Sequence, residues 1–484
     1  MALPRPLLLN VMTSSSAPVP YPTLAAPAHS ALEALFGERL RTDTDTLGSW
    51  GRDWTRSFTV APSAVVFPES TEEVVELVQT ARTHRFALVP SGGRTGLSGG
   101  AVAPAGEVVV SFDRMHRILD LDVPGQLMRC EAGVITQTIQ EHASEHGLYY
   151  PVDFASAGSS QIGGNVATNA GGIKVIRYGM TRDWVAGLQV VTGRGEVLDL
   201  GRGLVKDNTG YDLRQLFIGS EGTLGLITEV TLRLTRAPAA QQVLVLGLPA
   251  FPVVMEVLNA FRSRLEVSAF EFFDHKALAK VLSRTGLPRP FEANPESVPF
   301  YALVEVETAV DADAPLGVFE HCVEQGWVVD GVLSQSEEQA RKLWRLREDI
   351  SETISHWTPY KNDLAVRVAD VPAFLAEVDA FAAQRYPDLE VVWFGHIGDG
   401  NLHLNILKPE AMPQHEFYDR CHAASKAIFE TVRRYGGSVS AEHGVGLLKK
   451  DYLGYSRSDP EIAYLRAIRS TFDPDGILNP GKLV

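Results

Sequence analysis

The sequence contains little cysteine, and its three cysteines lie far apart along the 484 residues, at Cys130, Cys322 and Cys421. No C-x-x-C spacing occurs, so we expect neither a disulfide framework nor an iron-sulfur or cysteine-zinc site, and a reducing, cytoplasmic location fits. The sequence also lacks an excess of basic residues, because its formal net charge is −15. Such a charge repels phosphate backbones and anionic lipid, so nucleic acid and membrane surfaces are poor candidate partners.

Long hydrophobic runs are missing as well, and no stretch approaches the length that a membrane helix needs. The first residues, 1–25, contain a brief apolar run, but they carry one arginine, are broken by proline and lack a convincing cleavage site. We interpret them as a disordered leader, with Met12 as an alternative start.

The length exceeds that of one ordinary core, so we expect two or three domains that can bury a large cofactor. Ser70, followed by Glu73 and apolar residues at helical spacing, predicts a capped amphipathic helix. Two β-rich runs around Gly193 and Gly195 predict a hairpin. Helical patterns lengthen after Ala239, where we place a boundary before an α+β domain. The expected division is 1–25 (leader), 26–238, 239–430 and 431–484, the last packing back on another domain.

Two glycine-rich segments occur in the first half, "PSGGRTGLSGGAV" (90–102) and "DFASAGSSQIGGNVATNAGG" (153–172). Glycine lets backbone N–H groups approach a phosphate that a Cβ would obstruct. One such segment alone could be a connector, but two in one domain are seldom linkers, and "IGSEGTLGLIT" (218–228) adds a third close approach. The first segment lacks G-x-G-x-x-G and precedes a strand-like run, and "GILNPGKL" ends in leucine where Walker A needs Ser or Thr, so neither a Rossmann turn nor a P-loop is supported.

These motifs, in this order, with "DPDGILNPGK" near the end, resemble the flavin dehydrogenases of the vanillyl-alcohol oxidase and p-cresol methylhydroxylase type. The resemblance implies an α+β fold: a two-subdomain FAD-binding domain of the p-cresol methylhydroxylase type (26–238), an α+β substrate-binding cap domain (239–430) and a C-terminal segment returning to the flavin domain (431–484). It implies FAD without a covalent link, because relatives with covalent FAD carry a histidine near the first loop, where this sequence has Arg94. The residues expected to bind FAD are Pro90, Ser91, Gly92, Gly93, Arg94, Thr95, Gly96, Ser98, Gly99, Gly158, Ser159, Ile162, Gly163, Gly164, Asn165, Thr168, Asn169, Gly172, Glu221, Gly222, Ile227 and Asn479.

The stretch "GHIGDGNLHLN" (395–405) places two histidines around an Asp-Gly pair, which is a strong signal for a two-residue hairpin turn. If Asp399 and Gly400 form that turn, His396 and His403 pair across the strands with Cβ atoms roughly 5 Å apart, and Asn405 shares their face. A histidine pair alone is more often a core or surface pair. Two histidines with one carboxylate, however, make an open zinc-type site, and "SAEHGVG" (440–446) supplies Glu442 beside His443.

The two motifs together resemble the D-2-hydroxy-acid dehydrogenase branch of the family, particularly the D-2-hydroxyglutarate dehydrogenases. This resemblance implies that a divalent metal, with zinc as the first candidate, is held by His396, His403 and Glu442. It also implies that His443 is the catalytic base. A chelated ion would acidify the substrate hydroxyl, His443 would take its proton, and the hydride would pass to flavin N5.

The segment "SEEQARKLWRLREDISETISHW" (336–357) is helical in pattern, with Arg347 inside its apolar stripe and Ser351 one turn later. An arginine there either reaches a domain edge or grips a carboxylate by two hydrogen bonds. With Lys361, these residues resemble the segment that binds the distal carboxylate of D-2-hydroxyglutarate. The expected substrate-binding residues are Arg347, Ser351, Lys361, Asn405 and His443.

The sequence therefore predicts an FAD- and metal-dependent dehydrogenase that oxidises D-2-hydroxyglutarate to 2-oxoglutarate. D-malate is an alternative because serine stands at position 351 where threonine is expected, and D-lactate or glycolate dehydrogenases of the same architecture are rivals. A non-enzymatic flavoprotein is the rival from another class, and the metal-site residues argue against it. Without a fused iron-sulfur module, we expect a separate acceptor, an electron-transfer flavoprotein or a quinone-linked carrier, and a homodimer would be ordinary for this resemblance.

Overall fold

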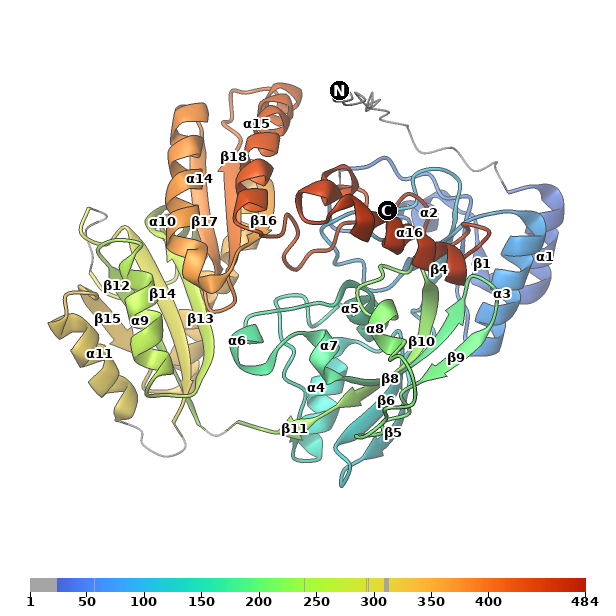
Figure 1. Cartoon of the computed structure of the whole chain (residues 1–484), viewed down its shortest axis with the longest axis horizontal. Coiled ribbons are helices and arrows are strands. Elements are labelled where there is room, and N and C mark those ends of the chain that lie inside the picture. The colour runs from blue at the N-terminus through green and yellow to red at the C-terminus, as the bar shows by residue number, and fades with distance from the viewer. Residues whose placement is uncertain (1–23, 56, 239, 293, 295, 309–312) are drawn as a thin grey trace, which may run out of the picture.

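The computed structural model describes residues 24–484, except positions 56, 239, 293, 295 and 309–312. Residues 1–23 of the predicted leader lie outside the described residues, and so does Ala239 at the predicted domain boundary. Figure 1 shows two units side by side, an N-terminal unit (24–236) and a central unit (241–434), with helix α16 (Asp459–Phe472) lying on the first.

The first sheet of the N-terminal unit has four strands in the order β1-β2-β4-β3, and the last three run parallel. The helix predicted from residue 70 is confirmed as α3, since the Ser70 hydroxyl accepts a hydrogen bond from the Glu73 N–H. The helices and strands of this part are α1 (Ala26–Phe36), β1 (Leu40–Arg41), α2 (Thr44–Trp50), β2 (Ala64–Val66), α3 (Thr71–His84), β3 (Leu88–Ser91) and β4 (Val108–Ser111).

The second sheet is antiparallel, in the order β5-β6-β10-β8-β9. The hairpin predicted around Gly193 and Gly195 is confirmed as β8 and β9. The second glycine-rich segment (153–172) was expected to be a loop, but residues 162–168 form helix α5, so that prediction is wrong in part. The elements are β5 (Ile118–Asp122), β6 (Leu127–Glu131), α4 (Thr136–Glu145), β7 (Leu148–Tyr149), α5 (Ile162–Thr168), α6 (Val175–Tyr178), α7 (Thr181–Trp184), β8 (Val185–Thr192), β9 (Val197–Leu200), α8 (Arg214–Phe217), β10 (Gly225–Arg233) and β11 (Thr235–Arg236).

The central unit is built on a seven-stranded antiparallel sheet in the order β15-β12-β14-β13-β17-β18-β16. Alternate residues of each strand point to opposite faces, so Leu244 and Leu246 enter one core with α9, α11, α14 and α15, and Val243 and Val245 enter another with α10, α12 and α13. The strands are β12 (Gln241–Leu248), β13 (Val267–Asp274), β14 (Phe300–Glu307), β15 (Asp330–Leu333), β16 (Tyr360–Ala365), β17 (Glu390–His396) and β18 (Asn401–Leu407). The helices are α9 (Val253–Arg262), α10 (His275–Thr285), α11 (Ala314–Glu324), α12 (Glu337–Glu348), α13 (Ile350–Ile354), α14 (Val371–Arg385) and α15 (Gln414–Arg434).

The single helix that we predicted from residue 336 to 357 is divided at Asp349 into α12 and α13. The Asp349 carboxylate accepts hydrogen bonds from the Arg345 guanidinium, at 2.9 and 3.1 Å, and aspartate is a weak helix former. Arg347 therefore lies in the last turn of α12, and Ser351 lies in α13.

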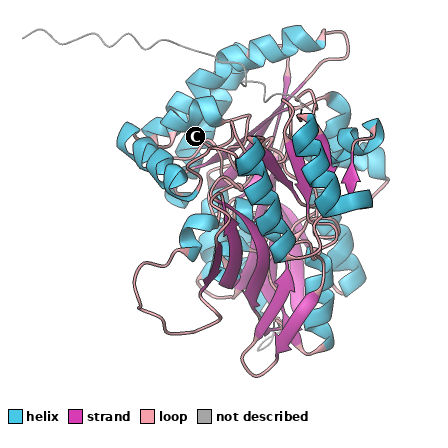
Figure 2. Cartoon of the chain, turned by 90° about the vertical axis from the view of Figure 1, so that its right-hand side faces the viewer, coloured by secondary structure: helices cyan, strands magenta, loops and turns pink. Residues whose placement is uncertain are grey.

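The C-terminal segment leaves α15 and crosses from the central unit to the N-terminal unit (Figure 1). Beyond the 3-10 helix Lys450–Tyr455 and α16, Leu478 pairs with Leu88 and enters the first core. The predicted return of the C-terminal segment to the first unit is therefore confirmed. In the view turned by 90°, strands lie at the centre with helices outside them (Figure 2). In the part of the chain that the structure describes, no helix is long and apolar enough to cross a membrane.

Candidate active site

A cavity in the N-terminal unit brings most of the predicted FAD residues together. Its lining includes, of those residues, Pro90, Gly92, Gly93, Arg94, Thr95, Gly96, Ser98, Gly163, Gly164, Asn165, Thr168, Glu221, Gly222 and Ile227. Six further lining residues lie within the three predicted glycine-rich segments but were not singled out, namely Gly100, Ala101, Gln161, Ala167, Gly225 and Leu226. The sequence did not indicate Asp53, Phe112 and Ala132, which lie outside those segments. The two glycine-rich segments and the third one thus converge on one cavity.

The remaining predicted FAD residues lie around the cavity without lining it. Asn479 donates hydrogen bonds to the carbonyls of Gly100 and Glu221, and its Oδ1 is buried without a partner. The Ser91 hydroxyl bonds to the Trp50 carbonyl, and Asn169 accepts a hydrogen bond from the Arg182 N–H. The others support neighbouring segments and are Gly99, Gly158, Ser159, Ile162 and Gly172.

The glycines explain why these segments can meet and still leave room for a ligand. A Cβ on Gly93 would lie 2.0 Å from the Ser159 carbonyl oxygen, so only glycine allows this approach. A Cβ on Gly164 would meet no protein atom within 4 Å and would enter the cavity instead. Gln161 lines the same cavity with a buried Oε1 that has no partner. A glycine-lined cavity with unpaired amide oxygens at its edge fits an extended dinucleotide such as FAD.

The predicted metal residues lie on one face of the central sheet, but not in the register that we expected. His396 pairs with Asn401 and Phe394 pairs with His403, so His396 and His403 are diagonal neighbours and the prediction that they stand directly opposite is wrong. The predicted two-residue Asp-Gly turn is replaced by a four-residue connection, Ile397 to Gly400, because Ile397 is fully buried in the central core. The two rings remain close, with centroids 5.3 Å apart.

Sheet register brings two further carboxylates onto this face. Glu271 of β13 stands opposite His396, and Asp363 of β16 stands opposite His403. Glu271 Oε1 is hydrogen-bonded to His396 Nδ1 at 2.7 Å. Asp363 lies 3.8 Å from His403 Nδ1 and 3.4 Å from His443 Nδ1. The sequence reasoning assigned neither residue, although a glutamate inside the apolar strand "AFEFFD" is itself unusual.

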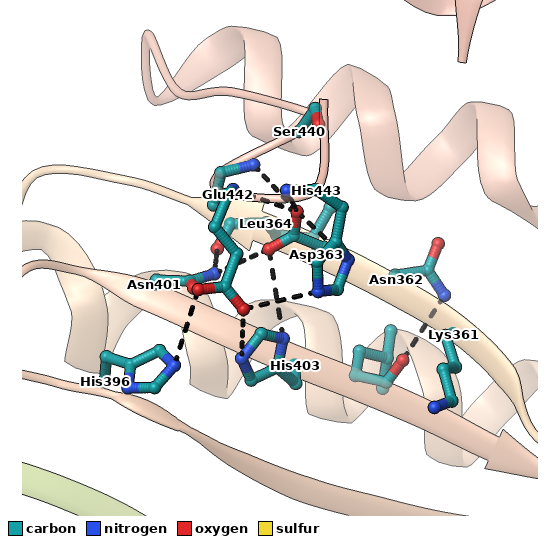
Figure 3. Close-up of polar contacts among 12 residues, drawn as sticks. Lys361, Asn362, Asp363, Leu364, His396, Asn401, His403, Ser440, Glu442 and His443 are labelled. Carbon is teal, nitrogen blue, oxygen red and sulfur yellow. Dashed lines mark hydrogen bonds and ion pairs between the residues drawn. The ribbon is translucent and has the colours of Figure 1, made fainter. Parts of the chain in front are cut away.

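The Nε2 atoms of the three histidines all face the carboxylate of Glu442, as Figure 3 shows. The distances from Glu442 oxygens are 3.8 Å to His396, 3.5 Å to His403 and 3.3 Å to His443. Among the described residues, Asp363, His403, Glu442 and His443 form a group whose metal-type ligand atoms lie within 4.8 Å of one another. It contains two of the three predicted metal residues, and His396 stands at its border.

The donor set suits a divalent ion for a further reason. Metal-bound histidines usually donate their second ring N–H to a carboxylate, which leaves the other nitrogen free to bind. Glu271 occupies that position for His396 through a hydrogen bond, whereas Asp363 faces the Nδ1 atoms of His403 and His443 at 3.8 and 3.4 Å. The Nε2 atoms of all three rings face Glu442. Imidazole and carboxylate ligands with open positions are typical of catalytic zinc.

Two buried carboxylates, one from each unit, hold the turn that carries Glu442 and His443. Asp363 Oδ2 accepts hydrogen bonds from three consecutive backbone N–H groups, those of Ala441, Glu442 and His443, each at 3.1 Å. Glu221, from the cavity of the N-terminal unit, accepts the N–H groups of Val445 and Gly446 at 2.7 Å. The turn therefore joins the cavity to the histidine cluster.

The opposite end of this turn touches the first glycine-rich loop. Leu447 and Leu448 donate their N–H groups to the Ser98 carbonyl. Gly446 has a φ of +51°, and a Cβ there would lie 2.2 Å from the same oxygen. A glycine is therefore required where the C-terminal segment meets the cavity.

The electrostatics of the cluster follow from burial and from these pairs. Burial lowers the pKa of His403 to about 3, so that ring is neutral. Burial acts in the same direction on His396, but the Glu271 carboxylate overcomes it and raises the pKa to about 9. Burial opposes ionisation of Asp363, yet His443 and Lys449 together lower its pKa far below the ordinary value. Asp363 is thus a fixed negative charge at the centre of the site.

The predicted carboxylate-binding residues lie farther along the same face of the sheet. Lys361 pairs with Asn405 across the β16–β18 ladder, two residues from Asp363 and His403. Lys361 Nζ donates to the Ser351 hydroxyl at 3.0 Å, and burial lowers its pKa. Arg347 is 5% exposed, lies over the Phe394 ring and has a buried Nε without a hydrogen-bond partner. Its guanidinium is paired with Glu271, a contact that the sequence did not indicate.

Comparison with known proteins agrees with this architecture. The profile of the FAD binding domain matches residues 62–201, and that of the C-terminal domain of FAD linked oxidases matches residues 237–483. The D-2-hydroxyglutarate dehydrogenase of Stutzerimonas stutzeri is 61% identical over 447 residues, covering 92% of this chain and 96% of that protein. That of Xanthomonas citri pv. viticola is 52% identical over 456 residues, covering 94% and 96%. The solved structure of p-cresol methylhydroxylase superposes with a TM-score of 0.76 at 16% identity, over 96% of this chain and 98% of that one.

The fold and the cavity therefore define an FAD-dependent oxidoreductase of the FAD linked oxidase class. Within that class, the chain belongs to the family of the D-2-hydroxyglutarate dehydrogenases. The predicted family, fold class and FAD cofactor are confirmed.

Proposed function

We propose that this chain oxidises D-2-hydroxyglutarate to 2-oxoglutarate, in a site where a divalent metal, FAD and two substrate-binding cations meet. The relatives that carry this name support the substrate. The observation that carries the proposal is the placement of Arg347 and Lys361 on the sheet face that holds His396 and His403. A diacid needs one contact for each carboxylate, and this face offers both a metal-type cluster and a pair of cations.

His396, His403 and Glu442 would hold the metal, with zinc as the first candidate, and the glycine-lined cavity would hold FAD without a covalent link. A bound ion supplies Lewis acidity that lowers the pKa of an α-hydroxyl, and bound FAD supplies the hydride acceptor. The turn between the cavity and the cluster fits this arrangement, because Glu221 lines the former and bonds to the latter.

The chain's own groups then divide the remaining work. His443 accepts the hydroxyl proton through Nε2, while Asp363, 3.4 Å from its Nδ1, stabilises the resulting imidazolium. Arg347 and Lys361 bind the distal carboxylate, with Ser351 holding the lysine and Asn405 beside it. Arg347, Asp363 and Asn405 are buried, and Lys361, Ser351 and His443 are half-buried, so little water surrounds these groups and each charge contact is strengthened.

The test is anaerobic flavin reduction by a panel of D- and L-2-hydroxy acids, before and after treatment with a chelator. Bleaching by D-2-hydroxyglutarate that is lost on chelation and restored by zinc supports the proposal. An unchanged rate after chelation would refute the metal assignment, and bleaching by L-isomers alone would refute the stereochemistry.

Selection of a diacid is tested with Arg347→Met. Binding of the distal carboxylate by Arg347 predicts that this variant loses far more kcat/KM with D-2-hydroxyglutarate than with D-lactate. Equal losses on both substrates would favour a D-lactate or glycolate dehydrogenase of the same architecture. D-malate, run in parallel, shows which diacid length the site prefers.

Electrons leave the reduced flavin to a separate acceptor, an electron-transfer flavoprotein or a quinone-linked carrier, and a homodimer is the expected assembly. Steady-state turnover with each purified carrier, and sedimentation of the purified protein, check these points. A protein that binds FAD but is bleached by no hydroxy acid would be a non-enzymatic flavoprotein instead.

A further inference from the structure

Glu271 is a fully buried carboxylate between two groups with different tasks. It is 1% exposed and stands on β13 directly opposite His396. Its Oε1 is hydrogen-bonded to His396 Nδ1 at 2.7 Å, and its Oε2 lies 2.8 Å from Arg347 Nη2. The second contact is an ion pair whose alignment falls outside that of a hydrogen bond. Each oxygen thus serves one partner.

The two partners belong to the two ends of the proposed substrate. His396 turns its Nε2 toward Glu442, 3.8 Å away, in the cluster that would hold the metal. Arg347 lies with its guanidinium carbon 4.7 Å from the Phe394 ring centroid, and its Nε is buried without a hydrogen-bond partner. Glu271 pairs with the guanidinium edge at Nη2 while Phe394 covers its face, and the Nε–H is left for a ligand carboxylate.

We propose that Glu271 is a positioning residue that couples the metal site to the distal-carboxylate site, by holding the His396 ring and the Arg347 guanidinium at the same time. The inference rests on the proposed function for the identity of the ligands. The coupling itself comes from the geometry: movement of one partner changes the charge and position that Glu271 offers the other. Metal affinity and preference for a diacid are then linked properties.

Replacement by glutamine separates this role from that of a simple buried ion pair. Glutamine keeps the shape but has one oxygen for two donors. If the oxygen faces Arg347, the amide NH₂ points at His396 Nδ1 and favours the tautomer whose Nε2 carries hydrogen and cannot bind a metal. If the oxygen faces His396, the NH₂ points at a guanidinium. One partner or the other is lost in either orientation.

The experiment compares wild type, Glu271→Gln and Asp274→Asn, all as flavin-loaded protein. Asp274 is a matched control because it is a buried carboxylate on the same strand, but it bonds the N–H groups of Ala277 and Trp393. Zinc affinity is measured on metal-stripped protein by competition with a chromophoric chelator. The ratio of kcat/KM for D-2-hydroxyglutarate over D-lactate is measured on the zinc-loaded protein.

We expect Glu271→Gln to weaken zinc binding by about 10- to 100-fold, or to lower the diacid preference about tenfold, or both, while Asp274→Asn leaves both within twofold. Unchanged values for both properties in Glu271→Gln would overturn the coupling. A loss of diacid preference in Arg347→Met, with Glu271→Gln unchanged, would refute the coupling but keep the proposed function.

A second variant keeps the inference testable if Glu271→Gln does not fold. Arg347→Met leaves the whole charge of Glu271 to His396, so it is expected to bind zinc at least as tightly as wild type while it loses diacid preference. A simple buried ion pair predicts the opposite for the metal, because an unpaired buried charge loosens the surrounding structure. Weaker zinc binding by Arg347→Met would therefore overturn the proposal.

Discussion

The turn that carries Glu442 and His443 allows a sharp test, because Asp363 holds it through three parallel hydrogen bonds. In Asp363→Asn the amide has one oxygen, which can serve the N–H groups of residues 441–443. Its NH₂ then faces the Asn401 amide, whose Nδ2 donates to Asp363 Oδ1 at 2.9 Å in the native protein. The variant therefore loses one hydrogen bond outright and the charge that strengthens the other three.

The loss of unfolding free energy in Asp363→Asn can be worked out from these contacts. An ordinary hydrogen bond contributes about 1 kcal/mol, and the loss of an ionic partner weakens each of the three remaining bonds by roughly the same amount. The sum is about 4 kcal/mol, before any cost for Lys449, whose buried Nζ lies 3.5 Å from Asp363. For a unit of this size such a loss lowers the melting temperature by roughly 10 °C.

The assay is hydrogen exchange of the backbone amides of residues 441–446, together with thermal unfolding. Exchange at residues 441–443 should accelerate by about 1,000-fold, whereas Asp274→Asn should lower the melting temperature without affecting these amides. If Asp363→Asn lowers the melting temperature but leaves the exchange of residues 441–443 as in wild type, the carboxylate does not hold the turn and the reasoning fails.

Three further predictions can be checked by single variants. His443→Gln should keep FAD and zinc but lose about 10²- to 10⁴-fold in kcat, as stopped-flow flavin reduction would show, and a loss below tenfold would remove His443 as the base. Gly93→Ala should destabilise the protein and release flavin because of its clash with Ser159, whereas Gly164→Ala should weaken FAD binding at an unchanged melting temperature of the flavin-free protein; identical behaviour of the two variants would contradict the cavity geometry. Burial lowers the pKa of Lys482 from 10.5 to about 8, so the unfolded chain binds more protons between these values and this group adds about 3 kcal/mol of stability as pH rises from 8 to 10.5. The melting temperature of wild type should therefore rise relative to that of Lys482→Met as the pH increases across this range. A difference in melting temperature that stays constant would refute the lowered pKa of Lys482.

Features with a local cause could be predicted from the sequence. The start of α3 follows from the Ser70 cap, and the glycine-rich segments follow from positions where a Cβ cannot fit, such as Gly93 against Ser159. The resemblance to flavin dehydrogenases depended on the same glycines. The domain boundary at residue 238 stays a prediction, since Ala239 lies outside the described residues, and the boundary predicted at residue 430 falls within helix α15.

Features that depend on distant partners could not be predicted. The Asp399-Gly400 signal gave the wrong register because burial of Ile397 in the central core outweighs the preference of a two-residue turn. Asp363 and Glu271 acquire their roles only when β16 and β13 are aligned with the histidine strands, and no local pattern fixes that alignment. A search for charged residues within apolar strands would have found Glu271.

The turn between the two units also comes late in the chain, after the residues that hold it. Residues 441–446 leave the ribosome after the strands that supply Asp363 and the loop that supplies Glu221. A chain that ends before this turn therefore lacks Glu442 and His443 and also Leu478, which pairs with Leu88 of β3. Glu442 and His443 are thus synthesised after both of the carboxylates that hold their turn in place.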